Sequence, residues 1–259
     1  MKILVSSDWH CDAVTAGVER MPELVSFAQE IDAAIQEQEI DLVLNLGDCW
    51  DPGTVNDPRW CRFIYSTFVH LGRTTRLRSD GGGNAPGLLC IPGNHDVIDT
   101  SEPTSTLSGL DVAGDPSVEV FERPTCYGVT RQNQHAALLA LPYVSRSYER
   151  TDDYRRSLEV ALEAALRAAR NSPLIVFAHL AFEGMIPGSE TTDMARGREV
   201  QFPVALVEEL SPTLVLNGHY HQRQTIRRGA LDIEIPGAPI RFTFGEAKDG
   251  PRGFLVLEV

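Results

Sequence analysis

Five short segments of this 259-residue chain each end an apolar run with a residue that can bind a metal ion. The segments are Asp8-Trp9-His10, Gly47-Asp48, Gly93-Asn94-His95-Asp96, His179 and Gly218-His219-Tyr220-His221. The apolar runs before them have the length and composition of buried strands. A parallel sheet gathers such strand ends along one edge, where open α/β folds place their active sites. The pattern therefore predicts an α/β fold with a metal-binding active site at this edge.

The rest of the chain alternates helix-like and strand-like stretches. Apolar periodicity predicts helices over 22–39, 57–72, 152–170 and 203–209, and we expect Asp152 to cap the third of these. Residues 76–87 contain a run of three glycines and are expected to form a flexible loop. The region 223–259 is expected to form β-hairpins. Because no repeat, charged tail or linker interrupts the chain, we predict a single domain over residues 1–259.

The charge balance limits how the chain can hold nucleic acid. Lys and Arg number 23 against 36 Asp and Glu, so the formal net charge is −13. An acidic protein is poorly suited to grip the backbone of duplex DNA. Two divalent cations would nevertheless add +4 at the site, against −2 from Asp8 and Asp48, so the site itself could attract a phosphodiester.

The five cysteines and the apolar runs bear on the compartment. An odd cysteine count without any C-x-x-C pair favours reduced thiols, and hence a cytoplasmic protein. No apolar run approaches the ~20 residues of a membrane span. The N-terminal segment leads straight into a ligand motif, so we expect no signal peptide.

The spacing of the candidate ligands suggests how they share ions. Side chains alternate along an extended backbone, so Asp8 and His10 should point the same way and bind one ion, and His219 and His221 should do likewise. Asp48, at the end of a central strand, could bridge two ions. Mixed imidazole and carboxylate ligands suit Mn, Fe or Zn better than Ca.

Together the motifs resemble those of the calcineurin-like metallophosphoesterases, whose pattern is D-x-H, G-D, G-N-H-D/E, H and G-H-x-H. The resemblance covers residues 8–221 and implies a double β-sandwich flanked by helices. It also implies a two-metal site, with Mn²⁺ as the preferred ion and Fe²⁺, Zn²⁺ or Mg²⁺ as alternatives. One metal would be bound by Asp8, His10, Asp48 and His221, and the other by Asp48, Asn94, His179 and His219.

Within that family the chain looks closest to the SbcD-type DNA repair nucleases. The segments that carry this likeness are Ser7-Asp8-Trp9-His10, residues 47–51, Leu141-Pro142-Tyr143, His179 with Glu183-Gly184, and a strand-turn-strand expected over 235–246. That branch carries a DNA-capping domain and a region that binds an ATPase partner. Here the chain reaches Val259 directly after the core, so we expect neither region, which leaves the ATPase partnership without support.

Three further residues are candidates for a direct part in the chemistry. Two cations held close together can activate a water molecule and neutralise charge on a phosphate. His95 is not needed as a ligand, so it could stabilise the developing charge or protonate the leaving oxygen. Asp51 and Asp96 could orient the ligand imidazoles.

The leading hypothesis is a metal-dependent phosphodiesterase that acts on nucleic acid, with DNA as the favoured substrate and either an exonuclease or an endonuclease mode. The alternatives are a phosphodiesterase for 2′,3′- or 3′,5′-cyclic nucleotides, a general phosphoesterase, an inactive metal-binding scaffold and a protein phosphatase. Several residues near the motifs are better explained by packing or solvent exposure. These residues are Trp9, Trp50, Cys11, Cys49, His70, His135, Arg223, Arg227 and Arg228.

Overall fold

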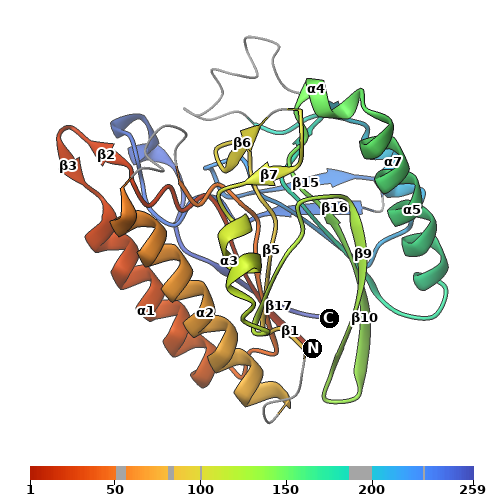
Figure 1. Ribbon diagram of the computed structural model, residues 1–259, viewed down its shortest axis with the longest axis horizontal. Coiled ribbons are helices and arrows are strands. Elements are labelled where there is room, and N and C mark those ends of the chain that lie inside the picture. Colours follow the sequence, from red (N-terminus) through yellow and green to blue (C-terminus); the bar gives the residue numbers. More distant parts are fainter. Residues whose placement is uncertain (51–56, 81–84, 100, 187–199, 230) are drawn as a thin grey trace.

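Two β-sheets stack face to face, and helices cover both outer faces, in a computed structural model that describes residues 1–50, 57–80, 85–99, 101–186, 200–229 and 231–259 (Figure 1). The first sheet has the strand order β17-β1-β4-β5-β8. Its strands are β17 (Leu255–Glu258), β1 (Lys2–Ser6), β4 (Leu42–Asn45), β5 (Leu88–Cys90) and β8 (Val118–Val120). All are parallel except β17, which pairs antiparallel with β1.

The second sheet has the order β15-β16-β14-β11-β10-β9. Its strands are β15 (Gln224–Arg228), β16 (Leu231–Ile235), β14 (Leu214–Asn217), β11 (Leu174–Ala178), β10 (Gln134–Leu141) and β9 (Thr125–Arg131). The four inner strands are parallel, and the two edge strands, β15 and β9, are antiparallel to their neighbours. The expected double sandwich flanked by helices is therefore confirmed.

Three apolar layers hold these elements together. The central layer lies between the sheets and contains Ile3 and Val5 of β1 together with Ile175 and Phe177 of β11. Leu4, between Ile3 and Val5, points the other way into the layer under the helices of the first sheet. This alternation, with both faces buried, explains why the strand reads as a continuous apolar run.

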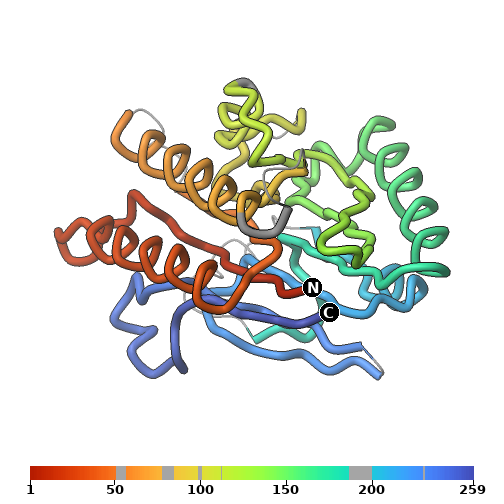
Figure 2. Tube along the Cα trace, turned by 90° about the horizontal axis from the view of Figure 1, so that it is seen from below, coloured from red at the N-terminus to blue at the C-terminus, as the bar shows by residue number. Residues whose placement is uncertain are grey.

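The outer layers are closed by helices on opposite sides of the sandwich (Figures 1 and 2). On the first sheet lie α1 (Met21–Glu37), α2 (Pro58–Asp80) and α3 (Ser108–Ala113). On the second lie α4 (Arg146–Glu149), α5 (Asp152–Ala168) and α7 (Val204–Glu208). Figure 2 shows the two chain ends side by side, where the amino group of Met1 donates to the carbonyl of Val259 at 2.7 Å.

Short two-stranded pieces complete the fold. They are β2 (Val14–Thr15) with β3 (Val18–Glu19), β6 (Val97–Asp99) with β7 (Thr104–Ser105), and β12 (Ala181–Phe182) with β13 (Gln201–Phe202). No helix among the described residues is long and apolar enough to cross a membrane.

Three local predictions were wrong. Helix α2 continues to Asp80, through part of the loop expected over 76–87, and Thr75 near its end is still fully buried. Helix α5 is capped by Thr151 rather than Asp152, since the Thr151 hydroxyl accepts from the Tyr154 amide at 3.1 Å.

The third correction concerns the C-terminal region. Among its described residues, only β15 and β16 form a hairpin. The residues that follow, where a strand-turn-strand was expected to end near 246, contain the 3₁₀-helix η1 (Phe244–Lys248). The chain then returns as β17 to pair with β1 at the other end of the sequence. This long-range pairing has no local pattern from which it could be predicted.

Candidate metal centre

The five ligand segments follow the carboxyl ends of β1, β4, β5, β11 and β14. Three of these strands belong to the first sheet and two to the second. The expectation of a single sheet edge was therefore wrong, and the site lies where corresponding ends of both sheets meet. Ligands from the two sheets face one another across this junction.

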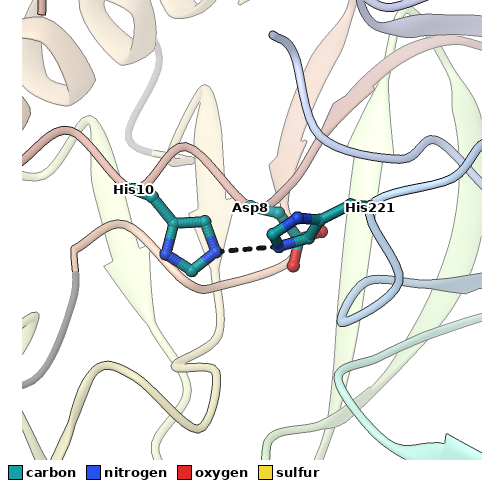
Figure 3. Close-up of side chains that lie close together, drawn as sticks. All are labelled: Asp8, His10 and His221. Atoms are coloured by element: carbon teal, nitrogen blue, oxygen red, sulfur yellow. Dashed lines mark hydrogen bonds between the residues drawn. The ribbon is translucent and has the colours of Figure 1, made fainter. Parts of the chain in front are cut away.

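One group of ligands, which we call cluster one, consists of Asp8, His10 and His221 (Figure 3). The Nε2 atoms of His10 and His221 lie 3.2 Å apart, although each comes from a different sheet. The Asp8 Oδ1 atom accepts the backbone N–H of His219 at 3.1 Å, while its Oδ2 atom is buried without a hydrogen-bond partner. A buried carboxylate oxygen of this kind is costly unless a cation or donor occupies the space beside it.

The second group, cluster two, consists of Asp48, His179 and His219, with the amide of Asn94 beside them. The Asn94 Oδ1 atom lies 3.2 Å from His179 Nε2 and 2.9 Å from His219 Nδ1. His179 Nδ1 donates to the Leu46 carbonyl at 2.6 Å, which directs its Nε2 atom at the cluster.

Asp48 joins the two clusters. Its Oδ2 atom is 3.2 Å from His179 Nε2 and 3.9 Å from His10 Nε2. Its Oδ1 atom accepts the backbone N–H of His95 at 2.9 Å, which fixes the direction of the carboxylate. One oxygen thus lies between imidazoles of both clusters, as a bridging ligand requires.

Electrostatics within the centre favour cations. Burial alone would raise the pKa of Asp48, but the imidazoles of His179, His95 and His10 hold it well below its usual range. Burial alone would lower the pKa of His179, yet Asp48 beside it raises that pKa to about 9. The buried carboxylate therefore holds a positive charge next to it. Together with the unpartnered Asp8 oxygen and the converging imidazoles, this donor set fits two divalent cations.

The backbone at the ligands is not extended, contrary to the alternation argument. Asp8, His10, Asp48 and His219 have φ angles of 55°, 40°, 55° and 76°. Non-glycine residues enter this left-handed region at a cost, and Asp and His do so more readily than most. His219 and His221 consequently reach different clusters, as the family resemblance implied, rather than the same ion.

The residue between the first two ligands anchors their loop. Trp9 is fully buried under α1 and α2, with its ring 5.2 Å from Phe27 and 5.6 Å from Phe68. Its indole N–H donates to the Ser6 hydroxyl at 3.2 Å. Trp9 therefore fixes the loop in the core, and the core role expected for it is confirmed. Trp50 is likewise fully buried.

Two glycines allow the backbone to approach the ligands closely. A Cβ atom on Gly218 would lie 2.6 Å from the Leu46 carbonyl oxygen and 2.9 Å from His179 Nδ1 in cluster two. Gly237 has a φ of 74°, and a Cβ atom there would lie 2.7 Å from the carbonyl oxygen of His221 in cluster one. Each cluster thus depends on at least one position without a side chain.

The three residues predicted to take part in catalysis differ in their positions relative to the ligands. The His95 ring packs against His10 with 4.9 Å between centroids and belongs to neither ligand group, which agrees with a non-ligand role. Asp96 is buried and accepts the backbone N–H groups of Asp48, Cys49 and Gly93 at 2.7–2.9 Å. These bonds organise the ligand loops rather than an imidazole. Asp51 lies outside the described residues.

Burial raises the pKa of Asp96 to about 7, and the neighbouring Asp48 charge adds to that effect. The backbone donors of Gly93 and Cys49 act in the opposite direction and offset part of this cost. Asp96 is therefore a buried carboxyl group held in place by main-chain N–H groups.

A buried carboxylate that the sequence reasoning did not single out contacts cluster one. Glu246, at 3% exposure, places Oε1 3.4 Å from His221 Nδ1. Glu246 lies 25 positions from His221 in the sequence and in an irregular segment, so no local sequence pattern indicated this contact. The residues that were set aside do stay apart from the ligands. His70 pairs with Asp32 on a helix surface, His135 lies near Thr130 on β9, and burial raises the pKa of the Cys49 thiol well above its ordinary value.

Comparison with known proteins agrees with this geometry. The sequence profile of the calcineurin-like phosphoesterases matches residues 1–223. The chain is 26% identical over 266 aligned residues to the SbcD subunit of the nuclease SbcCD from Bacillus subtilis, and 24% identical over 264 to that from Escherichia coli. Both alignments cover 95% of this chain, and they cover 63% and 62% of the relatives. The chain therefore spans less than two thirds of their length.

Among solved structures, one match is GAP50, the anchor in the inner membrane complex of Plasmodium, with a TM-score of 0.54 and 13% identity. The match covers 99% of this chain and 80% of that protein. At this identity it supports the fold alone.

Proposed function

The chain belongs to the calcineurin-like phosphoesterase family, and on that basis we propose that it is a two-metal phosphodiesterase that cleaves DNA as an SbcD-like nuclease. The observation that carries the phosphodiesterase assignment is the pair of buried ligand clusters joined by Asp48. The nuclease assignment is supported by the two SbcD relatives, which align along 95% of the chain.

The ligand roles follow from the contacts. Asp8, His10 and His221 would hold one cation, Asn94, His179 and His219 the other, and Asp48 both. When bound there, two divalent cations would supply hydroxide at neutral pH and neutralise charge that develops on the phosphoryl group. We propose Mn²⁺ as the working metal because the ligands mix imidazole with carboxylate and amide oxygens.

Two side chains that are not metal ligands have further roles, one in protonating the leaving group and one in orienting the ligand loops. His95 lies beside His10 without serving as a ligand, so its imidazole is placed to donate a proton to the leaving oxygen. Asp96 keeps the loops after β4 and β5 in register by binding backbone N–H groups of both. The roles of His95 and Asp96 are thus different: one acts on the substrate and the other on ligand geometry.

Aromatic side chains beside cluster one support a nucleotide substrate. The Phe242 ring packs edge-on against His10 at 5.2 Å and against His221 at 5.5 Å. Two residues further on, Phe244 is 81% exposed. Exposed aromatic rings are surfaces on which unpaired bases stack, and we propose that Phe244, in the same segment as Phe242, serves as one. With the −13 net charge, this favours single-stranded or flexible diesters over long duplex.

The proposal is tested by comparing rates on matched single-stranded and duplex oligonucleotides with Mn²⁺ at two salt concentrations. We expect faster cleavage of the single strand and a shallow dependence on salt. Faster duplex cleavage with a steep salt dependence would contradict the substrate preference. RNA and both kinds of cyclic nucleotide belong in the same panel.

A cyclic nucleotide phosphodiesterase is the second candidate. The acidic surface favours it, because a small substrate needs few basic contacts. Turnover of cyclic nucleotides without cleavage of any oligonucleotide would select this candidate. We further propose a cytoplasmic location, since all five cysteines are without disulfides.

A further inference from the structure

We propose that Glu246, held in place by Arg252, is a positioning residue that sets the orientation and tautomer of His221, and so controls the affinity of cluster one for its metal. The inference rests on the two-metal site proposed above. It concerns residues beyond the stretch that matches the family profile, which ends at residue 223. In that region the chain leaves β16 and passes back over the end of the sandwich before β17.

The contact between Glu246 and His221 has the chemistry needed to orient a ligand. The Glu246 Oε1 atom faces His221 Nδ1 at 3.4 Å, while His221 Nε2 lies 3.2 Å from His10 Nε2 within cluster one. A carboxylate that accepts the Nδ1–H of a histidine leaves the Nε2 lone pair available for metal. It also makes that nitrogen a stronger ligand, since negative charge lies behind the ring.

Glu246 is itself fixed on several sides. Its Oε2 atom accepts hydrogen bonds from the backbone N–H of Phe242 and from one guanidinium nitrogen of Arg252, each at 3.0 Å. The Thr243 hydroxyl lies 3.4 Å from Oε1. A carboxylate bound in this way cannot easily rotate away from the imidazole behind which it lies.

Arg252 joins this carboxylate to the ligand's backbone. One nitrogen of its guanidinium binds Glu246 at 3.0 Å and Asp249 at 2.6 Å, and another donates to the carbonyl of His221. Arg252 therefore contacts the main chain of the same histidine whose side chain Glu246 contacts. Side chain and backbone of His221 are held by one ion pair.

The burial of this pair argues for function rather than stability. The side chains of Glu246 and Arg252 are 3% and 6% exposed. A buried ion pair gains little net stability, because desolvation offsets most of the attraction, and apolar residues of similar volume often serve as well. A role in orienting His221 gives a reason for placing these charges behind a metal ligand.

The test measures Mn²⁺ binding to the full chain by calorimetry and metal analysis, without substrate. In Glu246→Gln, which keeps the size of the side chain, we expect the affinity of one of two sites to fall by about 10–100-fold while the other stays unchanged. Electron paramagnetic resonance at limiting Mn²⁺ should then show isolated ions in place of a coupled pair. Glu234→Gln is the matched control, since that carboxylate on β16 binds the Thr225 hydroxyl.

Glu246→Asp provides a second variant that keeps the charge and shortens the reach, and it should recover part of the lost affinity. Unchanged affinity at both sites in Glu246→Gln would overturn the inference and leave the two-metal assignment intact. Equal weakening of both sites with a lower melting temperature would also overturn it, because the role would then be structural. A wild-type chain that binds fewer than two Mn²⁺ ions would overturn the proposed function as well.

Discussion

The two ligand clusters are built from the same two sheets but are held in different ways. In cluster two, His179 is fixed by a hydrogen bond to the main-chain carbonyl of Leu46. The backbone at Gly218 lies so close to its imidazole that a Cβ atom there would clash with it. In cluster one, His221 is backed by charged side chains, Glu246 and Arg252, from the C-terminal region. His179 of cluster two is therefore held by the backbone of the sandwich, whereas His221 of cluster one also needs a network of charged side chains behind it.

This difference predicts which substitutions act on both metals and which act on one. Main-chain support cannot be removed by shortening a side chain, so the orientation of His179 should tolerate most side-chain changes around it. Cluster one should be more sensitive, because its support depends on side-chain charge. Asp48 contacts imidazoles of both clusters, so a substitution there should affect both metal sites.

The largest expected effect comes from Asp48→Asn. Loss of the bridging charge should weaken both sites and lower kcat by about 1,000-fold, which corresponds to several kcal/mol of lost charge stabilisation. Metal content per chain and turnover of a chromogenic diester measure the two effects. Asp152→Asn is the control, since that carboxylate on α5 is 99% exposed. Full metal content and full activity in Asp48→Asn would refute the bridging assignment.

His95→Ala should separate metal binding from chemistry. Both clusters should keep their metals, because His95 is in neither ligand group. The rate on an unactivated diester should fall by about 100-fold or more, the range typical of a lost general acid. A diester with a good leaving group should be less affected, as it needs no protonation. An unchanged rate on the unactivated diester would remove His95 from the mechanism, and His70→Ala on the α2 surface is the control.

The sequence was sufficient to predict the strands whose ends carry the candidate ligands, and the structure brings these residues together. Each ligand follows a short buried strand, and such a run ending in Asp or His is a local pattern. The division of His219 and His221 between clusters was not predictable from spacing, because it depends on the left-handed backbone at His219. There the two histidines are grouped as the family resemblance implied, and not as the alternation argument predicted.

What could not be predicted depends on contacts between distant parts of the chain. Glu246 is separated from His221 by 25 positions and lies in a 3₁₀-helix, where neither of the common periodicities applies. The pairing of β17 with β1 joins opposite ends of the sequence. Thr151, rather than the predicted Asp152, caps α5. The sequence could not decide between these neighbours, because both side chains are suitable N-caps.

A pair of glycine substitutions sharpens the comparison between the clusters. Gly218→Ala should lower Mn²⁺ affinity mainly at cluster two, since the new methyl would press on His179 and the Leu46 carbonyl. Gly237→Ala should act mainly on cluster one through the carbonyl of His221. We expect losses of about 10-fold or more, the lower end of the effect of disturbing ligand orientation. Calorimetry on both variants, with melting temperatures to confirm folding, measures the effect; the same site weakening in both would contradict the distinction.

The smallest expected effect concerns the substrate side of cluster one. Phe244→Ala should raise KM for a single-stranded oligonucleotide by about 5-fold, since stacking of one base contributes ~1–3 kcal/mol and the exposed ring should supply the lower end. Metal content should not change, because Phe244 belongs to neither ligand group. A chromogenic diester without a base should show the same KM in variant and wild type. Leu77→Ala, at an exposed apolar position on α2, is the matched control. If KM for the oligonucleotide and for the base-free diester rise together, Phe244 supports the site without contacting a base, and the preference for single strands must come from the charge distribution alone.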